Sequence, residues 1–172
     1  MARTATYAPN EVSVVITQLS TGIVHLVSGY SEDSIVAVDR NSDTFSMYKG
    51  ADDSATRIYN SDTALVVTLS LQQTVTSNDV LTALYRNDSA SKDAMFSVLI
   101  ADNSGRSRFF AEEAYIAKLP DAKYSNSMQI REWVLHAPNS EMTIGGNVSY
   151  SPADQAVLEA LGVSIDPRWA SK

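Results

Sequence analysis

The stretch TALVVTLSLQ, residues 63–72, alternates apolar and polar side chains over most of its length. Its apolar positions recur at every second residue: Leu65, Val67, Leu69 and Leu71. The polar residues between them share the opposite parity: Thr68, Ser70 and Gln72. Because successive side chains of a strand point to opposite faces of a sheet, this pattern predicts a strand with one buried face. The stretch therefore favours a β fold with its core on one side of a sheet.

Segments of similar character lie on both sides of this stretch. The further predicted strands are Glu11 to Leu19, Ile23 to Val27, Ser34 to Val38, Thr44 to Tyr48, Thr56 to Tyr59, Met95 to Ala101, Arg106 to Leu119, Met128 to His136 and Glu141 to Ile144. Turn-forming residues separate them, as in residues 41–43, 60–62 and 102–105. The face of the Arg106 strand that carries Phe109, Ala111 and Tyr115 is interrupted by Glu113, which predicts a bulge there.

Two segments have helical spacing instead. Ser77 is the expected cap of a helix over about Asn78 to Asn87. Ser151 is the expected cap of a second helix, with Pro152 in its first turn, and Gly162 ends it. The fold class predicted is mainly β with minor α: a β-barrel or sandwich with one mid-chain helix and a C-terminal helix. Residues 1–150 are expected to form the β-barrel domain and residues 151–172 a C-terminal helical extension.

Composition excludes several function classes. The 172 residues contain no cysteine, so disulfides and thiolate metal sites are absent. The formal charge is −7 with scattered Lys and Arg, which argues against tight binding of a phosphate backbone. Apolar runs are far shorter than the ~20 residues that span a bilayer, so no membrane association is expected. Residues 1–9 lack an apolar run, and no signal peptide is expected.

The sequence offers no catalytic constellation. His25 and His136 have no ligand spacing of a metal site, and no Gly-x-Ser-x-Gly motif is present. Glu112 and Glu113 are adjacent in a predicted strand, so they are expected to point to opposite faces. We therefore predict that the chain is not an enzyme and has no catalytic, cofactor-binding or metal-binding residues.

One long segment carries a family resemblance. Residues 38–84 read VDRNSDTFSMYKGADDSATRIYNSDTALVVTLSLQQTVTSNDVLTAL, and ADNSGR, AEEAYIAKLPD and REWVL follow at residues 101–106, 111–121 and 131–135. This succession resembles a family of phage structural proteins regarded as tail tube subunits of contractile-tailed phages, over about residues 10 to 147. Asp53 stands where that family is expected to have glycine, and the segment after Tyr150 lies outside the resemblance.

The resemblance implies an assembly. It implies a barrel that forms hexameric rings, stacked into a hollow tube with a sheath protein around it and baseplate and tail terminator proteins at its ends. DNA is expected to pass through the lumen without specific binding, and the protein is expected in the virion tail after assembly in the host cytoplasm. The acidic balance leads to the hypothesis that carboxylates line the channel and keep DNA from adhering.

Specific segments are expected to make the contacts between subunits. The long strands Thr63 to Gln72 and Arg106 to Leu119 are expected to extend a sheet around the ring by edge pairing. The loop from residue 49 to residue 57 is the candidate for contacts between rings, since it combines acidic and basic residues: Lys49, Asp52, Asp53 and Arg57.

Three alternatives remain at this point. The first is a tube protein of a related contractile injection system, such as a tailocin or a type VI secretion system. The second is a monomeric β-barrel module that binds a carbohydrate or small ligand, which predicts an exposed aromatic cluster or a deep pocket. The third is a hydrolase that uses His25 or His136 with a nearby serine.

Overall fold

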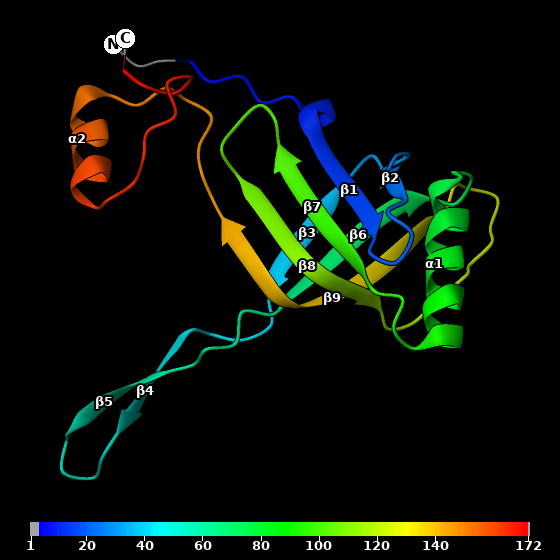
Figure 1. Ribbon diagram of the computed structural model, residues 1–172, viewed down its shortest axis with the longest axis horizontal. Coiled ribbons are helices and arrows are strands. Elements are labelled where there is room, and N and C mark those ends of the chain that lie inside the picture. Colours follow the sequence, from blue (N-terminus) through cyan, green and yellow to red (C-terminus); the bar gives the residue numbers. More distant parts are fainter. Residues whose placement is uncertain (1–3, 172) are drawn as a thin grey trace.

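The computed structural model describes residues 4–171 and is dominated by one antiparallel sheet (Figure 1). In chain order the elements are η1 (Pro9–Glu11), β1 (Val12–Gln18), β2 (Val24–Leu26), β3 (Val36–Arg40), β4 (Phe45–Lys49), β5 (Ala55–Tyr59), β6 (Leu65–Gln72), α1 (Ser77–Ser91), β7 (Phe96–Asp102), β8 (Arg108–Ile116), β9 (Ile130–Thr143) and α2 (Pro152–Ala160). Seven strands form the sheet in the order β2-β1-β7-β8-β9-β6-β3, and β4 pairs only with β5. The mainly β fold class with two helices is confirmed.

The sheet curls into a half-barrel, so that the inner faces of its two halves share one core (Figure 1). The inward face of β6 is buried as its alternation predicts, and no residue of that set is more than 3% exposed: Leu65, Val67, Leu69 and Leu71. Helix α1 lies across one end of the half-barrel and adds Leu81 and Leu84 to the core. Trp133 of β9 is among the largest buried side chains.

The strands expected at the sheet edges are interior strands. β6 lies between β9 and β3, and β8 lies between β7 and β9. Their backbone hydrogen-bonding groups are therefore used within the subunit, and the prediction that they extend the sheet around a ring is wrong. The two ends of the sheet are β2 and β3 in the described chain.

The predicted bulge near Glu113 is confirmed, and it changes which side chains face inward. The β8–β9 register shifts between Ala111 and Glu113 and again between Glu113 and Tyr115. After the shift, Ala114 and Ile116 are buried, and Tyr115 is 38% exposed. The prediction that Tyr115 and Ala111 share one face is therefore wrong. The bulge adds residues to β8, and this shifts the alternation of inward and outward side chains.

Two predicted strands are joined in β9. The segments Met128 to His136 and Glu141 to Ile144 lie largely within one strand, Ile130–Thr143, which also includes Pro138. Pairing with β6 ends at Ala137, and pairing with β8 occupies the other side through Thr143. Pro138 is tolerated because it follows the last residue paired to β6, where no ladder donor is required.

The helix ends agree only in part with the expected caps. Thr76 is the N-cap of α1 and makes no side-chain cap bond, while Ser77 lies inside the helix and is fully buried. Helix α1 continues to Ser91, four residues beyond its predicted end. Helix α2 has the expected cap, in which Ser151 Oγ accepts a hydrogen bond from the Asp154 amide at 3.2 Å. Within residues 4–171, no helix is both long enough and apolar enough to cross a membrane.

Candidate functional site

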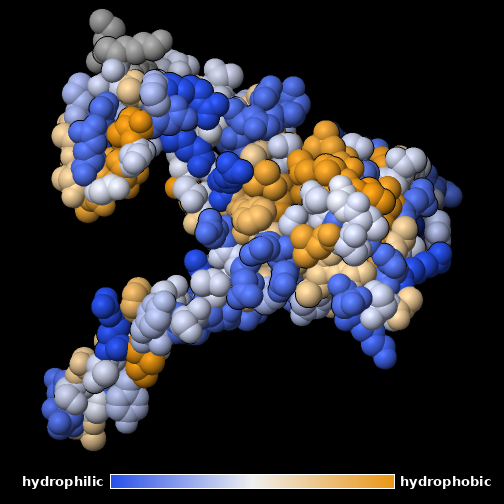
Figure 2. Space-filling model, in the orientation of Figure 1, coloured by the Kyte–Doolittle hydropathy of each residue, from blue (hydrophilic) through white to orange (hydrophobic). Residues whose placement is uncertain are grey.

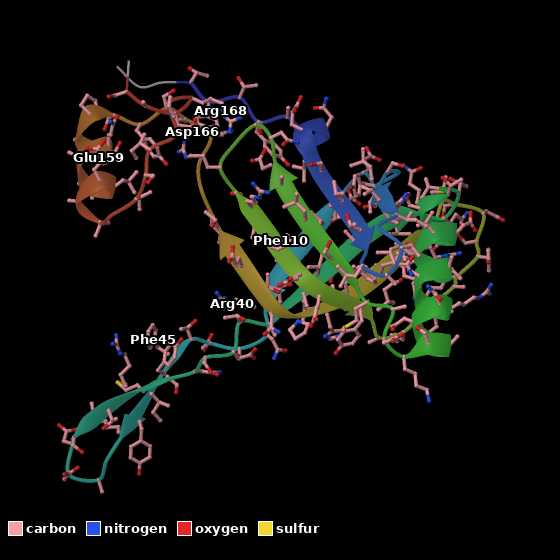
Figure 3. All side chains as sticks on the ribbon, in the orientation of Figure 1. Arg40, Phe45, Phe110, Glu159, Asp166 and Arg168 are labelled. Carbon is pink, nitrogen blue, oxygen red and sulfur yellow. The ribbon has the colours of Figure 1, made fainter. Side chains whose placement is uncertain are left out.

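A hairpin arm formed by residues 44–60 stands away from the sheet, with β4 and β5 as its two strands (Figures 1 and 3). Every residue of both strands is exposed. The exposed residues include five large apolar side chains: Phe45, Met47, Tyr48, Ile58 and Tyr59. A two-stranded ribbon without a core is marginally stable in water. The apolar side chains of this one are not covered by the rest of the described chain, from which the arm projects in Figure 2. The hairpin arm is therefore the candidate surface for contacts with another molecule.

Hydrogen bonds fix the root of the hairpin arm to the sheet. The Asp62 carboxylate accepts from the Ala64 amide at 2.9 Å, from Ser42 Oγ at 2.7 Å and from Asn41 Nδ2 at 3.1 Å. The bond from the Ala64 backbone, followed by those from Ser42 and Asn41, lowers the pKa of Asp62. These hydrogen bonds join the segment that follows β3 to the segment that precedes β6, at the root of the arm. They therefore fix the direction in which the arm leaves the sheet.

The tip of the hairpin arm holds three of the four residues predicted for contacts between rings: Lys49, Asp52 and Asp53. Lys49 and Asp53 form an ion pair, and Asp53 has a left-handed φ of 67° at the position where a glycine was expected. Asp52 Oδ1 accepts two hydrogen bonds from Ser54, one from its Oγ at 2.7 Å and one from its backbone amide at 3.2 Å. These bonds, first that from the Ser54 side chain, lower the pKa of Asp52. Arg57 lies apart on β5, with its guanidinium 4.4 Å from the Phe45 ring.

A second arm, residues 144–171, carries α2 and is held to the sheet by Arg106. The Arg106 guanidinium lies 4.2 Å from the Tyr150 ring and 4.8 Å from the Trp169 ring, and its Nη1 donates to the Val148 carbonyl at 2.8 Å. Gly145 makes this approach possible, because a Cβ there would lie 2.6 Å from Arg106 Cβ. We call this set the Arg106 clasp. No spacing rule identified it, since Arg106 lies 44 residues before Tyr150 and 63 residues before Trp169 in the sequence.

We expect Arg106→Ala to loosen the second arm while leaving the sheet intact. Cation–π contacts are worth ~0.5–2 kcal/mol each, so losing two of them should raise amide exchange at Tyr150 about tenfold or more. The Tyr150 amide is the probe because it donates to the Trp169 carbonyl at 2.9 Å. Arg108→Ala, an exposed arginine nearby, is the matched control. Unchanged exchange in Arg106→Ala would contradict the role of the clasp.

The outward face of the sheet differs between its two halves. On β2, β1, β7 and β8, direct neighbours in the register form an apolar row: Leu26, Val15, Leu99 and Phe110. On β9, β6 and β3, the outward residues are mostly polar or small: Asp39, Ala37, Val66, Thr68, Ser70, Glu132, Val134 and His136. We call the second set the polar half. Phe110, which ends the apolar row, is marked on β8 in Figure 3.

The contact between His25 and Ser77 does not form a catalytic pair. His25 Nε2 lies 3.1 Å from Ser77 Oγ, and burial lowers the pKa of His25. Ser77 Oγ also accepts from the Ser28 amide at 3.1 Å, and the residue is fully buried, so a substrate has no access to it. His136 stacks on Tyr115 instead. No group of three or more metal-binding side chains occurs in the part of the chain that the structure describes.

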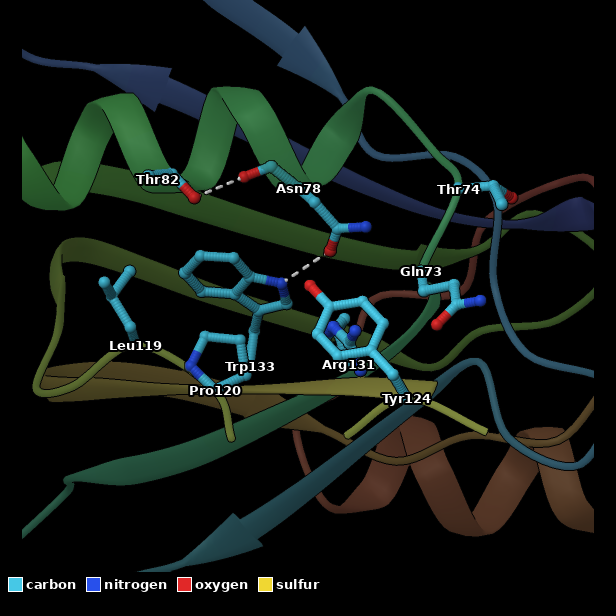
Figure 4. Close-up of a pocket in the computed structure, with 9 residues that line it drawn as sticks. All are labelled: Gln73, Thr74, Asn78, Thr82, Leu119, Pro120, Tyr124, Arg131 and Trp133. Atoms are coloured by element: carbon cyan, nitrogen blue, oxygen red, sulfur yellow. Dashed lines mark hydrogen bonds between the residues drawn. The ribbon is translucent and has the colours of Figure 1, made fainter. Parts of the chain in front are cut away.

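A cavity of about 440 Å³ opens at the α1 end of the sheet (Figure 4). Trp133 Nε1 donates to Asn78 Oδ1 at 2.9 Å along its wall, and Thr82 Oγ1 donates to the Asn78 carbonyl at 2.7 Å. Arg131 lies at its base and is 8% exposed, and the ring of Tyr124 covers the guanidinium at 5.2 Å. We call this cavity the Arg131 pocket. Sequence reasoning missed it, although Arg131 shares the inward parity of β9 with the buried residues Trp133 and Leu135.

Comparison with known proteins places this chain among phage tail components. The family described as "Bacteriophage PhiTE tail tube protein" matches residues 4–145. The chain is 51% identical over 169 residues to "Structural protein ORF10" of Pseudomonas phage KPP10, covering 97% of this chain and 98% of the relative.

Solved structures share the fold at low sequence identity. The tube terminating cap of the anti-feeding prophage has a TM-score of 0.55 at 14% identity, covering 83% of this chain and 94% of that one. A chain of the PVC sheath-tube complex, from an extracellular contractile injection system in its extended state, has a TM-score of 0.52 at 12% identity, covering 80% and 91%. The half-barrel is thus a fold found in contractile injection machines, and by its sequence the chain belongs to the tail tube protein family named for bacteriophage PhiTE.

Proposed function

We propose that copies of this chain form hexameric rings that stack into the tube of a phage tail, with the hairpin arm joining one ring to the next. The observation that carries the proposal is the exposed apolar surface of the hairpin arm, of which Phe45 and Tyr59 form a facing pair. In a tube built from one kind of chain, the partner that covers this surface is another copy. The ring number of six follows from the family resemblance.

Ring closure needs a contact between unlike surfaces of neighbouring subunits. The two ends of the sheet supply one, because β3 of one copy can lie against β2 of the next. A heterologous contact of this kind closes into a ring when the rotation between copies is right. β2 has three residues and β3 has five, so the pairing is short and has to be supplemented by side-chain contacts.

The polar half of the sheet is the surface that we assign to the lumen. It carries the exposed carboxylates Asp39 and Glu132, whereas the other half presents the apolar row. Six copies at −7 each carry about −42, and a narrow channel concentrates part of that field. Repulsion of the phosphate backbone keeps DNA mobile in the channel during ejection.

Replacing Glu132 by lysine is expected to slow genome ejection several-fold. A cation on the lumen surface attracts the phosphates that the native carboxylate repels. The measurement is the rate of DNA release from phage particles that carry the variant. Asp93→Lys, the same charge change at an exposed residue after α1, is the control and should leave the rate unchanged. Equal rates for Glu132→Lys and the native chain would count against the lumen assignment.

The partners and location follow from this role. We infer a sheath protein around the tube, with baseplate and tail terminator proteins at its ends, in a virion tail assembled in the host cytoplasm. The fold similarity to a chain of a sheath-tube complex supports the sheath as partner. The role is structural and needs neither catalysis nor a cofactor. Residues 1–150 supply the tube body and residues 151–172 the extension, consistent with a family match that ends at residue 145.

Sedimentation of the purified chain tests the ring. At 18.7 kDa per chain, a hexameric ring has a mass of about 112 kDa, and stacked rings form a series of multiples of that mass. We expect both species at micromolar concentration. A sample that contains only monomer at all concentrations would contradict the proposal and would favour the ligand-binding module. Within the structural class, the 51% identical phage protein favours a phage tail over another injection machine.

A further inference from the structure

Arg131 is a buried arginine without a carboxylate partner in the described chain. Its Nη1 and Nη2 each donate to the Lys123 carbonyl at 3.2 Å, and Nη1 also approaches the Ile130 carbonyl at 3.5 Å. The ion pairs found within residues 4–171 do not include it. Arg131 is 8% exposed, and its guanidinium contacts carbonyl oxygens and the face of the Tyr124 ring but no carboxylate of the described chain. It therefore keeps a positive charge that an anion can neutralise.

The Arg131 pocket has room for such an anion and a second unmet polar group. Gln73 is one of the residues that line the cavity, and its buried Oε1 accepts no hydrogen bond from the described residues. Leu119, Pro120 and Trp133 supply apolar walls. A matching occupant therefore carries a carboxylate for Arg131 and, close to it, an N–H or O–H donor for Gln73.

The pocket lies at the opposite end of the sheet from the hairpin arm. β6 begins at Leu65, beside the root of the arm, and ends at Gln72, beside the pocket. At ~3.3 Å per residue this strand spans roughly 23 Å. Figure 1 shows α1, which flanks the pocket, on one side of the sheet and the arm on the other. When identical subunits stack head to tail, each surface at one end meets a surface at the opposite end of the next copy.

The tip of the hairpin arm carries the groups that the pocket lacks. Asp53 is already paired with Lys49, whereas Asp52 uses Oδ1 for its bonds to Ser54 and keeps Oδ2 free within residues 4–171. The Ala51 amide beside it donates to no described acceptor. Asp52 is fully exposed at the turn, so a second copy can reach it.

We propose that the Arg131 pocket receives the tip of the hairpin arm of the next copy, with the Asp52 carboxylate on Arg131 and the Ala51 amide near Gln73. This inference rests on the proposed stacking of rings and names the residues of that contact. It gives the buried arginine its counter-ion only in the assembled tube. Assembly and ring-to-ring register are thereby coupled to one charged pair.

Engineered cysteines test the contact directly, because the native chain has none. Asp52→Cys combined with Tyr124→Cys places one thiol at the tip and one at the mouth of the pocket, where Tyr124 is 83% exposed. Oxidised tubes of this double variant are expected to give a ladder of linked chains on a non-reducing gel. Each single variant should give no ladder. Asp52→Cys with Ser20→Cys is the matched control, since Ser20 is exposed at the same end of the sheet.

The outcomes separate this inference from the proposed function. Tubes that form without a ladder from the Asp52→Cys, Tyr124→Cys pair, or with an equal ladder from the Ser20 control, overturn the pocket assignment alone. Native protein that forms no rings or tubes overturns the proposed function. If the double variant fails to assemble, the Asp52→Asn variant provides the test. We expect its critical concentration for tube growth to be about tenfold higher than that of the native chain. The control variant Glu32→Gln should have the native critical concentration. Equal critical concentrations for Asp52→Asn and the native chain would also overturn the inference.

Discussion

Deleting the hairpin arm is expected to leave a folded subunit that no longer forms tubes. Two glycines in place of residues 44–60 remove β4 and β5, which pair only with each other and contribute no buried residue. The half-barrel should therefore unfold at an unchanged denaturant concentration. Tube formation should require at least about a hundredfold higher concentration, because five large apolar side chains are lost from the contact between copies. Sedimentation and electron microscopy measure the protein concentration at which tubes form.

A matched variant separates the apolar contact from the length of the arm. Phe45→Ser with Tyr59→Ser removes one facing aromatic pair and keeps the hairpin, and it should reduce assembly strongly. Ser46→Ala with Thr56→Ala changes exposed polar residues of the same two strands and should assemble like the native chain. Tubes from the deletion variant at the native concentration would show that the arm does not join rings.

Leu69→Ala is expected to remove a large part of the free energy of unfolding of the subunit. Leu69 is fully buried in β6, opposite Val36 on one side and Trp133 on the other. Truncating a buried leucine costs about 3–5 kcal/mol, from lost transfer free energy and from the cavity left behind, out of a typical total of roughly 5–15 kcal/mol. Urea unfolding should show a lower midpoint with an unchanged slope.

The same strand supplies the control for this experiment. Val66 points to the outward side of β6, opposite the face that carries Leu69, and is only partly buried. Val66→Ala should lose less than about 1.5 kcal/mol, since the site leaves no enclosed cavity. Similar losses for Leu69→Ala and Val66→Ala would mean that the two faces of β6 are not inside and outside as described.

Local patterns in the sequence predicted the strands and helices well, but they did not predict which strands pair in the sheet. The alternation from Leu65 to Leu71 determined which face of β6 is buried, and the Ser151 capping box located α2. The order of strands depends on pairings such as Leu69 with Trp133, which lie 64 residues apart and leave no local signal. The Ser77 side chain is typical of a cap, but its contacts with His25 Nε2 and the Ser28 amide hold it in the buried first turn of α1.

The contact surfaces were only partly accessible to sequence reasoning. The loop with Lys49, Asp52 and Asp53 was selected for its charges, and the structure places these residues at the tip of a projecting hairpin. The apolar residues of that hairpin went unnoticed, because Phe45 and Met47 alternate as they do in a half-buried strand. Only the spatial arrangement shows that nothing in the described subunit covers them.

Cryo-electron microscopy of filaments grown from the purified chain tests the central claim most directly. We predict a tube of stacked rings in which the hairpin arm of every subunit crosses to the next ring and the face with Glu132 lines the bore. Filaments in which the arm folds back on its own subunit would contradict the account, as would a sample that stays monomeric.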